Sequence, residues 1–183
     1  MIGHFKTTPV FEWNYTSPFR ININQGGSSS GKTIGILQTL ALFAIKKKVV
    51  ITVIGQDIPN LRKGAVRDFE LVVLENAPFL RNKILSFNKT NLVYTFKNGS
   101  ILEFTSFADA QDAKGSRRDY AYFDEADAIP FTIYEQVVMR TKEKVFLCYN
   151  PSSEFWVHDI VMPQNDSVTY YSNFTHNPFC PQT

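Results

Sequence analysis

Apolar and polar positions recur along the chain with two different periods, which together predict an α/β domain. Residues 20–24 alternate polar and apolar side chains, as a strand with two different faces does. Residues 34–45 form a longer apolar segment that predicts a mostly buried helix, ended by the lysines at 46–48. Residues 49–55 are a continuous apolar run, which is typical of a parallel strand buried on both faces. This order predicts a mostly parallel sheet flanked by helices.

The rest of the chain continues this pattern with one interruption. Further helices are predicted at 61–76 and 132–140, and further strands at 119–123, 144–149 and 168–173. Between them, residues 84–107 hold three short β-branched or aromatic segments, and Asn98-Gly99 is a two-residue hairpin signal. This stretch therefore predicts an antiparallel hairpin or meander inserted beside the parallel sheet.

The first 19 residues differ from the rest because aromatic residues and prolines punctuate them. They predict an irregular arm packed on the surface of the domain. With 183 residues and 44% hydrophobic content, the chain is expected to form a single domain. We assign residues 1–19 to the arm and 20–179 to the core of this domain.

Charge and cysteine content exclude several classes of protein. The net charge of +2 does not indicate a nucleic-acid-binding protein, although Arg62, Lys63 and Arg67 form either a solvated face or a contact to DNA phosphates. Two cysteines give no disulfide framework, and Cys148 is expected to be a buried free thiol. The longest apolar run is too short to span a bilayer, and the N-terminus does not have the pattern of a signal peptide. A reducing cytoplasm fits best.

A glycine- and serine-rich stretch after the first predicted strand matches the Walker A pattern of phosphate-binding loops. Its residues are Gly26, Gly27, Ser28, Ser29, Ser30, Gly31, Lys32 and Thr33. Small residues let backbone N–H groups close around phosphate oxygens. Lys32 brings an ammonium group to the outer phosphates, and the hydroxyl of Thr33 is a ligand for Mg²⁺. The helix that follows directs its N-terminal dipole at the same anion, so ATP and Mg²⁺ are the expected ligands.

Two adjacent carboxylates, Asp124 and Glu125, follow the apolar strand at 119–123, as in the Walker B arrangement. Asp124 is expected to hold the shell of the Mg²⁺ ion, and Glu125 to polarise the attacking water as a general base. A helix N-cap would explain Asp127 well, but it does not explain an acidic pair directly after a buried strand. Together with the phosphate loop, the pair predicts ATP hydrolysis.

Two other places hold candidate contacts to a nucleotide. Asn150 follows the strand at 144–149, at the edge where open α/β sheets bind ligands, so it is a candidate sensor of the γ-phosphate. An ordinary Asn-Pro turn explains this residue equally well. In the N-terminal arm, Phe11, Trp13 and Asn14 are candidates for contacts to adenine, unless they only cover the core.

With these motifs, the chain resembles the ATPase domain of the large terminase subunit of tailed bacteriophages, over residues 20–179. Four features carry the resemblance: the Gly-Gly-x-x-Ser-Gly-Lys-Thr loop, Lys114-Gly115 where the family usually has Arg-Gly, Tyr122-Phe123-Asp124-Glu125-Ala126, and Asn150-Pro151 with Trp156 followed by Asn177-Pro178. The Walker motifs are generic, whereas the last feature is fairly specific. The resemblance implies a RecA-like parallel sheet in which the catalytic glutamate lies on the strand beside that of the phosphate loop.

The resemblance also implies a function, ATP-driven translocation of double-stranded DNA into a viral procapsid in the host cytoplasm. The implied partners are the DNA, the portal protein of the procapsid, a small terminase subunit or a packaging RNA, and further copies of the chain in a ring, with a pentamer expected. Carried over by position, Lys32 and Thr33 bind the phosphates and Mg²⁺, Asp124 and Glu125 take the Walker B and catalytic roles, and Asn150 matches the coupling motif.

Two departures from the family matter. Many terminases place an arginine within the phosphate loop, whereas residues 27–30 contain none, so we expect an arginine from a neighbouring subunit to contact the γ-phosphate. The candidates are Arg117, Arg118 and Arg140, with Lys114 as a weaker one. Full terminases also continue into a nuclease domain, but only four residues follow Phe179, so no nuclease activity is expected in this chain.

Two alternative functions remain open at this point. The segment from Asp124 to Asp127 matches the motif of DEAD-box helicases, but those proteins carry Ser-Ala-Thr where this chain has Asn150-Pro151-Ser152, and they need a second RecA-like domain. The other alternative is a non-catalytic module that binds ATP only to assemble. The position of Glu125 argues against it.

Overall fold

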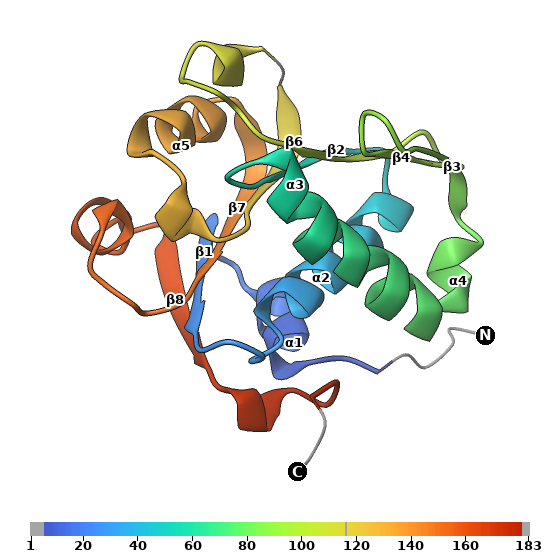
Figure 1. Ribbon diagram of the computed structural model, residues 1–183, viewed down its shortest axis with the longest axis horizontal. Coiled ribbons are helices and arrows are strands. Elements are labelled where there is room, and N and C mark those ends of the chain that lie inside the picture. The colour runs from blue at the N-terminus through green and yellow to red at the C-terminus, as the bar shows by residue number, and fades with distance from the viewer. Residues whose placement is uncertain (1–5, 116, 181–183) are drawn as a thin grey trace.

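The computed structural model describes residues 6–115 and 117–180, which are built around one eight-stranded sheet (Figure 1). The strands are β1 (Ile21–Gly26), β2 (Val50–Ile54), β3 (Ile84–Asn88), β4 (Val93–Phe96), β5 (Ile101–Thr105), β6 (Arg118–Phe123), β7 (Thr141–Tyr149) and β8 (Ser167–Ser172). Their order across the sheet is β3-β4-β5-β2-β6-β7-β1-β8. Neighbouring strands from β5 to β8 are parallel, whereas β3, β4 and β5 pair antiparallel. The predicted α/β sheet and its meander are both confirmed.

Helices cover the two faces of the sheet and enclose two apolar cores. The helices are α1 (Pro9–Thr16), α2 (Lys32–Lys46), α3 (Ile58–Leu61), α4 (Pro78–Arg81) and α5 (Phe131–Val138). One core lies under α1, α2 and the helix that starts at α3, and the other lies under α5 and the π-helical turn Val157–Val161. Among the described residues, no helix has the length and apolar character that crossing a membrane requires.

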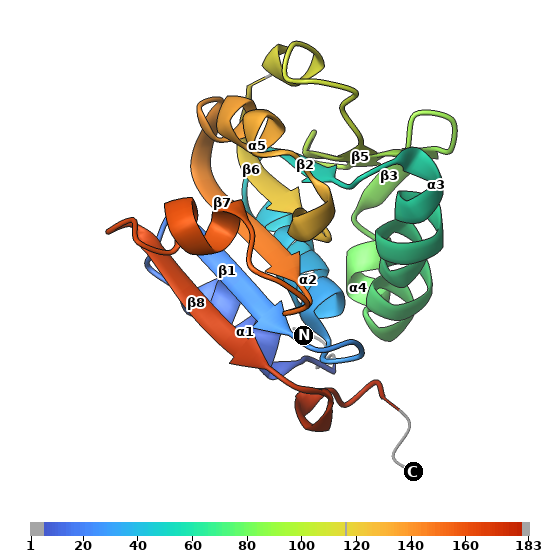
Figure 2. The ribbon, with the colours of Figure 1, turned by 60° about the vertical axis from the view of Figure 1, so that its left-hand side comes forward.

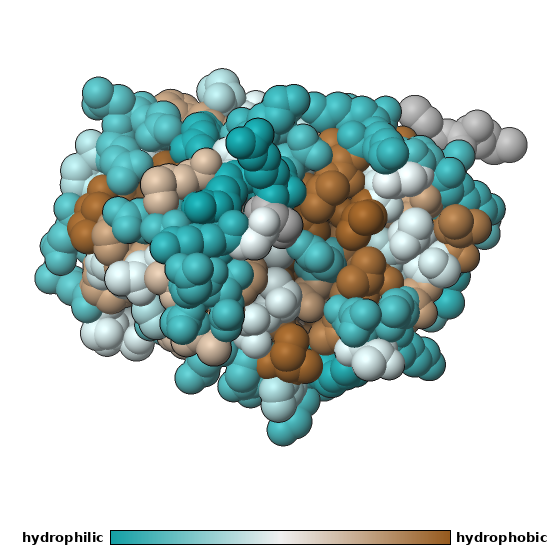
Figure 3. Space-filling model, turned by 90° about the horizontal axis from the view of Figure 1, so that it is seen from above, coloured by the Kyte–Doolittle hydropathy of each residue, from teal (hydrophilic) through white to brown (hydrophobic). Residues whose placement is uncertain are grey.

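The helix predicted at 61–76 begins three residues earlier, at α3, and continues through two π-helical segments, Arg62–Val66 and Phe69–Leu74. Its start is set by Asp57, whose carboxylate accepts a hydrogen bond of 2.7 Å from the backbone N–H of Asn60. Seen from above, the largest group of apolar residues lies to the right of the centre of the molecule, and hydrophilic residues cover most of the rest (Figure 3).

The N-terminal segment is not irregular as the sequence suggests, because residues 9–16 form the helix α1. The side chain of Thr8 accepts a hydrogen bond of 3.1 Å from the backbone N–H of Phe11, and Pro9 occupies the first turn. The helix packs against α2, and Val10 is fully buried between them. Residues 1–5 of the predicted arm lie outside the described residues.

The order of the strands corrects the arrangement implied by the resemblance. The catalytic candidate Glu125 follows β6, but β6 is not beside β1, because β7 lies between them. All three strands are parallel, so their carboxyl ends still meet at one edge of the sheet, where α2 begins (Figure 2). The inserted strand brings its own end residue, Asn150, to the centre of that edge.

Candidate functional site

The phosphate loop connects the end of β1 to the start of α2. Gly31 has a φ of 82° and Ser29 a φ of 62°, so two residues of the loop adopt the left-handed backbone conformation before the helix begins. Gly31 has no side chain to oppose its conformation, whereas Ser29 is held in a region that non-glycine residues rarely adopt. The loop leads directly into the N-terminus of α2, whose free N–H groups and dipole favour an anion.

Lys32 is folded back over this loop and is 8% exposed. Its Nζ donates hydrogen bonds to the carbonyl oxygens of Gly26 and Gly27, at 2.7 and 2.9 Å, and to Oδ1 of Asn150 at 3.1 Å. Burial lowers the pKa of Lys32, and the negative charges of nearby carboxylates oppose that change. The ammonium group is therefore held by neutral acceptors in the position where a phosphate would meet it.

Thr33 and Asp124 come together from α2 and the end of β6. The hydroxyl of Thr33 donates a hydrogen bond of 3.1 Å to Oδ1 of Asp124. A hydroxyl and a carboxylate are hard oxygen ligands that fit Mg²⁺. The described residues contain no group of three or more His, Cys, Asp or Glu side chains that would hold a metal ion alone. This composition fits Mg²⁺, which is usually bound by one or two protein groups together with phosphates and water.

Glu125 stands next to this pair in a strained backbone conformation, with a φ of 56°. Such strain in a non-glycine residue is typical of functional sites. Partial desolvation raises the pKa of the Glu125 carboxyl group, and the neighbouring charges of Asp124 and Asp127 add to the increase, while Lys32 opposes it. A carboxylate with a raised pKa is a stronger proton acceptor than an ordinary one.

The end of β8 and the segment that follows it brace the phosphate loop, and the sequence did not predict these contacts. Ser172 donates a hydrogen bond of 3.0 Å to Oγ of Ser30, and Nδ2 of Asn177 donates one of 2.7 Å to the carbonyl oxygen of Ser29. A Cβ at Gly26 would lie 2.4 Å from the carbonyl oxygen of Ser172. Asn177 belongs to the Asn177-Pro178 motif that the chain shares with the terminase family. This motif was the only indication in the sequence that Asn177 could lie at the site.

A further acidic residue, Asp68, was missed because it belongs to no motif. It projects from the helix between the two π-helical segments and lines a cavity of about 130 Å³ with the residues of the phosphate loop and Asn177. Burial raises the pKa of Asp68, while Arg67 lowers it and Asp124 raises it. Arg67, one of the three basic residues predicted on this helix, is exposed.

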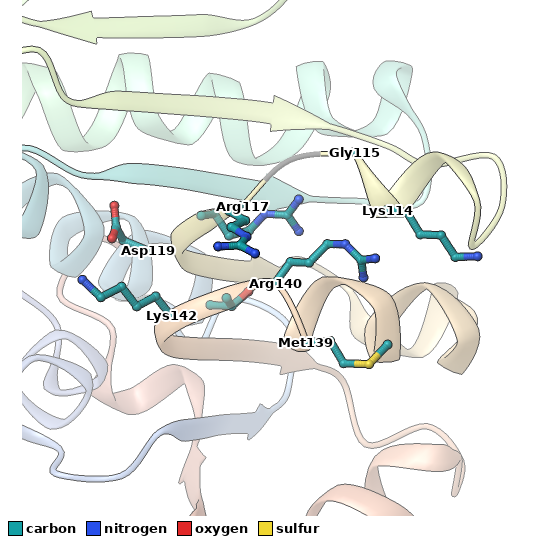
Figure 4. Close-up of a pocket in the computed structure, with 9 residues that line it drawn as sticks. Lys114, Gly115, Arg117, Asp119, Met139, Arg140 and Lys142 are labelled. Carbon is teal, nitrogen blue, oxygen red and sulfur yellow. The ribbon is translucent and has the colours of Figure 1, made fainter.

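The candidate arginines lie at the opposite edge of the sheet. Arg117, Arg118 and Arg140 line an open cavity of about 640 Å³ together with Lys114 and Lys142 (Figure 4). The cavity lies at the amino ends of β6 and β7, and at about 3.3 Å per residue Arg118 is about 20 Å from Asp124. None of these side chains therefore reaches the phosphate loop of its own chain.

Exposure separates the members of this cluster. Arg117 and Lys114 are exposed, Arg140 is half-buried and donates to the side chain of Gln136, and Arg118 is 3% exposed. Of the four, the exposed residues need no rearrangement to reach another molecule.

The candidate adenine contacts of the N-terminal segment include two buried residues, Phe11 and Asn14, and the half-buried Trp13. Asn14 is fully buried, and its Nδ2 donates hydrogen bonds of 2.8 Å to Oδ1 of Asn24 and to the carbonyl oxygen of Val10. Phe11 is 9% exposed, and Trp13 stacks on Tyr170 with ring centroids 5.0 Å apart. The interpretation that these residues cover the core accounts for their contacts.

Comparison with solved structures finds the same fold in several proteins of bacteriophages. The large terminase of a thermophilic bacteriophage, in complex with ADP, is 17% identical, with a TM-score of 0.77, and the match covers 97% of this chain and 48% of that protein. The ATPase domain of the Thermus phage P74-26 large terminase is 15% identical, with a TM-score of 0.67, covering 91% of this chain and 80% of that one. The Phi-28 gp11 DNA packaging motor is 15% identical, with a TM-score of 0.53, covering 91% and 59%. At these identities the matches show the fold alone.

The family comparison is more specific than the structural one. A comparison with curated proteins gives no match. The family model described as terminase large subunit, T4likevirus-type, N-terminal, matches residues 23–176, which hold the phosphate loop, both adjacent carboxylates and Asn150. This chain spans about half the length of the ADP-bound large terminase, at 48%. The chain therefore belongs to the family of terminase large subunit N-terminal domains.

Proposed function

We propose that this chain hydrolyses ATP to drive the movement of double-stranded DNA into a viral procapsid. The observation that carries the proposal is the meeting of Lys32, Thr33, Asp124, Glu125 and Asn150 at one edge of the sheet. These side chains follow the carboxyl ends of three different strands, β1, β6 and β7. Each side chain has a role that hydrolysis of a bound triphosphate requires.

Binding of ATP begins with the backbone N–H groups of the loop and the N-terminus of α2. Lys32 exchanges its contacts with Gly26, Gly27 and Asn150 for oxygens of the outer phosphates. Because Lys32 is only 8% exposed, its charge is then paired with phosphate at a buried position, where the attraction is stronger than in bulk solvent.

Thr33 and Asp124 would hold Mg²⁺ through their oxygen atoms. When bound, the ion neutralises the negative charge that develops on the phosphate oxygens. The hydrogen bond between these two side chains keeps both ligands at the same place before the metal arrives. Assembly of the site therefore requires little reorganisation of the protein.

Glu125 accepts a proton from the water that attacks the γ-phosphate. The water attacks the phosphorus atom in line with the β–γ bridging oxygen, the bond to that oxygen breaks, and ADP and inorganic phosphate are formed. Oδ1 of Asn150 accepts a hydrogen bond of 3.1 Å from Nζ of Lys32, so a phosphate that binds this ammonium group also changes the surroundings of Asn150. That change makes Asn150 the proposed reporter of γ-phosphate loss.

An arginine from a neighbouring copy completes the site in this proposal. The basic cluster cannot serve its own phosphate loop, because it lies at the other edge of the sheet. In a ring with head-to-tail interfaces, one edge of each copy faces the opposite edge of the next. The exposed Arg117 is the first candidate, followed by Arg140, then Arg118 and Lys114.

The remaining partners follow from family membership rather than from local geometry. They are double-stranded DNA, the portal protein of the procapsid, a small terminase subunit or a packaging RNA, and a pentameric ring of this chain in the host cytoplasm. Turnover that rises with the length of a DNA duplex, without separation of its strands, supports translocation. Strand separation would favour a helicase.

The test of hydrolysis uses purified protein, ATP and Mg²⁺. Lys32→Ala should lose nucleotide binding, and Glu125→Gln should keep binding but lose single-turnover hydrolysis. Matched controls are Lys46→Ala, at the other end of α2, and Glu135→Gln, on the exposed side of α5. Hydrolysis that survives unchanged in Glu125→Gln would contradict the proposal.

A further inference from the structure

We propose that Tyr122 and Cys148 position the carboxylate of Asp124 for the metal ion. This inference rests on the proposed function, because it assigns a task to two residues next to a proposed ligand of Mg²⁺. Neither residue would touch the nucleotide. Their contribution is to fix the direction in which Asp124 presents its oxygens.

The contacts around Asp124 are short and converge on a single atom. The hydroxyl of Tyr122 donates a hydrogen bond of 2.5 Å to Oδ1, and the thiol of Cys148 donates one of 3.3 Å to the same oxygen. The hydroxyl of Tyr122 also lies 3.1 Å from Sγ of Cys148 and 3.4 Å from Oγ1 of Thr33. Tyr122 is fully buried and Cys148 is 2% exposed, so both donor groups are shielded from water.

The sheet explains why these side chains meet. Tyr122 precedes Asp124 by two residues on the line of β6, so both side chains leave the same face of the sheet. Tyr122 pairs with Phe146 and Phe123 with Leu147 in the parallel ladder, which places Cys148 next to the position of Asp124. Tyr122 and Cys148 both belong to the core under α2, the helix that carries Thr33.

Tyr122 and Cys148 are neutral donors, which suits a carboxylate that has to bind a cation. An arginine or lysine would also orient a carboxylate, but its positive charge would repel Mg²⁺. A phenol and a thiol are neutral at pH 7, so they orient Asp124 and leave its negative charge available to the ion. Donors gathered on Oδ1 restrict the rotation of the carboxylate, so Oδ2 keeps a fixed direction. Groups that support metal ligands in this way typically change metal affinity by about 10- to 100-fold when they are removed.

The experiment measures Mg²⁺ rather than activity. A fluorescent ATP analogue is titrated into each variant in EDTA and at increasing Mg²⁺ concentration. For Tyr122→Phe we expect unchanged affinity in EDTA and a half-saturating Mg²⁺ concentration that rises by about tenfold. Tyr134→Phe is the matched control, because Tyr134 is also buried and its hydroxyl makes no hydrogen bond to a described residue. This control should leave the Mg²⁺ dependence as in the parent chain.

Thermal unfolding shows whether Tyr122→Phe is folded. If it is not, substitutions of Cys148 test the same inference. Cys148→Ala removes one donor and should raise the half-saturating Mg²⁺ concentration, whereas Cys148→Ser keeps a donor and should restore it. Unchanged Mg²⁺ dependence in folded Tyr122→Phe, or equal shifts in Cys148→Ala and Cys148→Ser, would overturn the inference and leave the proposed function standing. If the parent chain binds the analogue without any dependence on Mg²⁺, the proposed metal site fails as well.

Discussion

Lys32 and Asn150 are joined by a hydrogen bond of 3.1 Å between Nζ and Oδ1, although 118 positions separate them in the chain. The bond links the phosphate loop after β1 to the end of the neighbouring strand β7. We expect an incoming phosphate to compete with the amide oxygen of Asn150, because both accept hydrogen bonds from the same ammonium group. The contact is therefore a direct connection between nucleotide binding and the position of β7.

Asn150→Asp should weaken the binding of ATP by about tenfold, because like charges placed together at a binding site are costly. The new carboxylate would form an ion pair with Lys32 and face the incoming phosphates. Titration with a fluorescent ATP analogue measures the effect. Asn91→Asp, the same change in an exposed loop, is the control, and an equal effect in both variants would show that only the net charge matters.

Two adjacent glycines of the phosphate loop, Gly26 and Gly27, should differ in their tolerance of substitution by alanine. In Gly26→Ala the new Cβ would lie 2.4 Å from the carbonyl oxygen of Ser172, so we expect a loss of stability of about 1–3 kcal/mol and loss of nucleotide binding. In Gly27→Ala the Cβ meets no atom within 4 Å, so stability should change little. Chemical denaturation of both variants measures this difference. Equal stability of the two would mean that β8 does not brace the loop as described.

The order β1-β7-β6 could not be predicted from the sequence, because the apolar runs of these strands are similar and nothing local fixes their neighbours. The loop at 26–33 was predictable since its function depends on residues adjacent in the chain. Asp68 and Ser172 were not, because each reaches the site only through the fold. The helix α1 was missed because two prolines flank a short aromatic segment that looks irregular.

A mixing experiment tests whether the basic cluster acts on a neighbouring copy. Arg117→Ala subunits keep an intact phosphate loop, and Lys32→Ala subunits keep the cluster, so a mixed interface combines one working part from each. If Arg117 acts in trans, a one-to-one mixture should recover hydrolysis at about a quarter of its interfaces. The same design applies to Arg140→Ala, Arg118→Ala and Lys114→Ala. Absence of recovery at every ratio, for all four variants, would argue against the trans arrangement.

The pH dependence of hydrolysis should report on Glu125. A general base must be deprotonated to act, so the rate falls as the pH drops through its pKa. Because desolvation and the neighbouring carboxylates raise the pKa of Glu125, the acidic decline should occur at a higher pH than for an ordinary glutamate. Single-turnover rates at saturating ATP and Mg²⁺ measure this profile. A rate that stays constant down to the pH range of an ordinary carboxyl group would speak against Glu125 as the base.

The most direct measurement is a crystal structure of this chain with Mg²⁺ and a non-hydrolysable ATP analogue. We expect the γ-phosphate to contact Nζ of Lys32, the metal to contact Thr33 and Asp124, and the carboxylate of Glu125 to face the γ-phosphate across one water molecule. We also expect the bond between Lys32 and Asn150 to be lost or lengthened. Phosphates bound away from residues 26–33, or a Glu125 carboxylate turned away from the γ-phosphate, would contradict the proposed function.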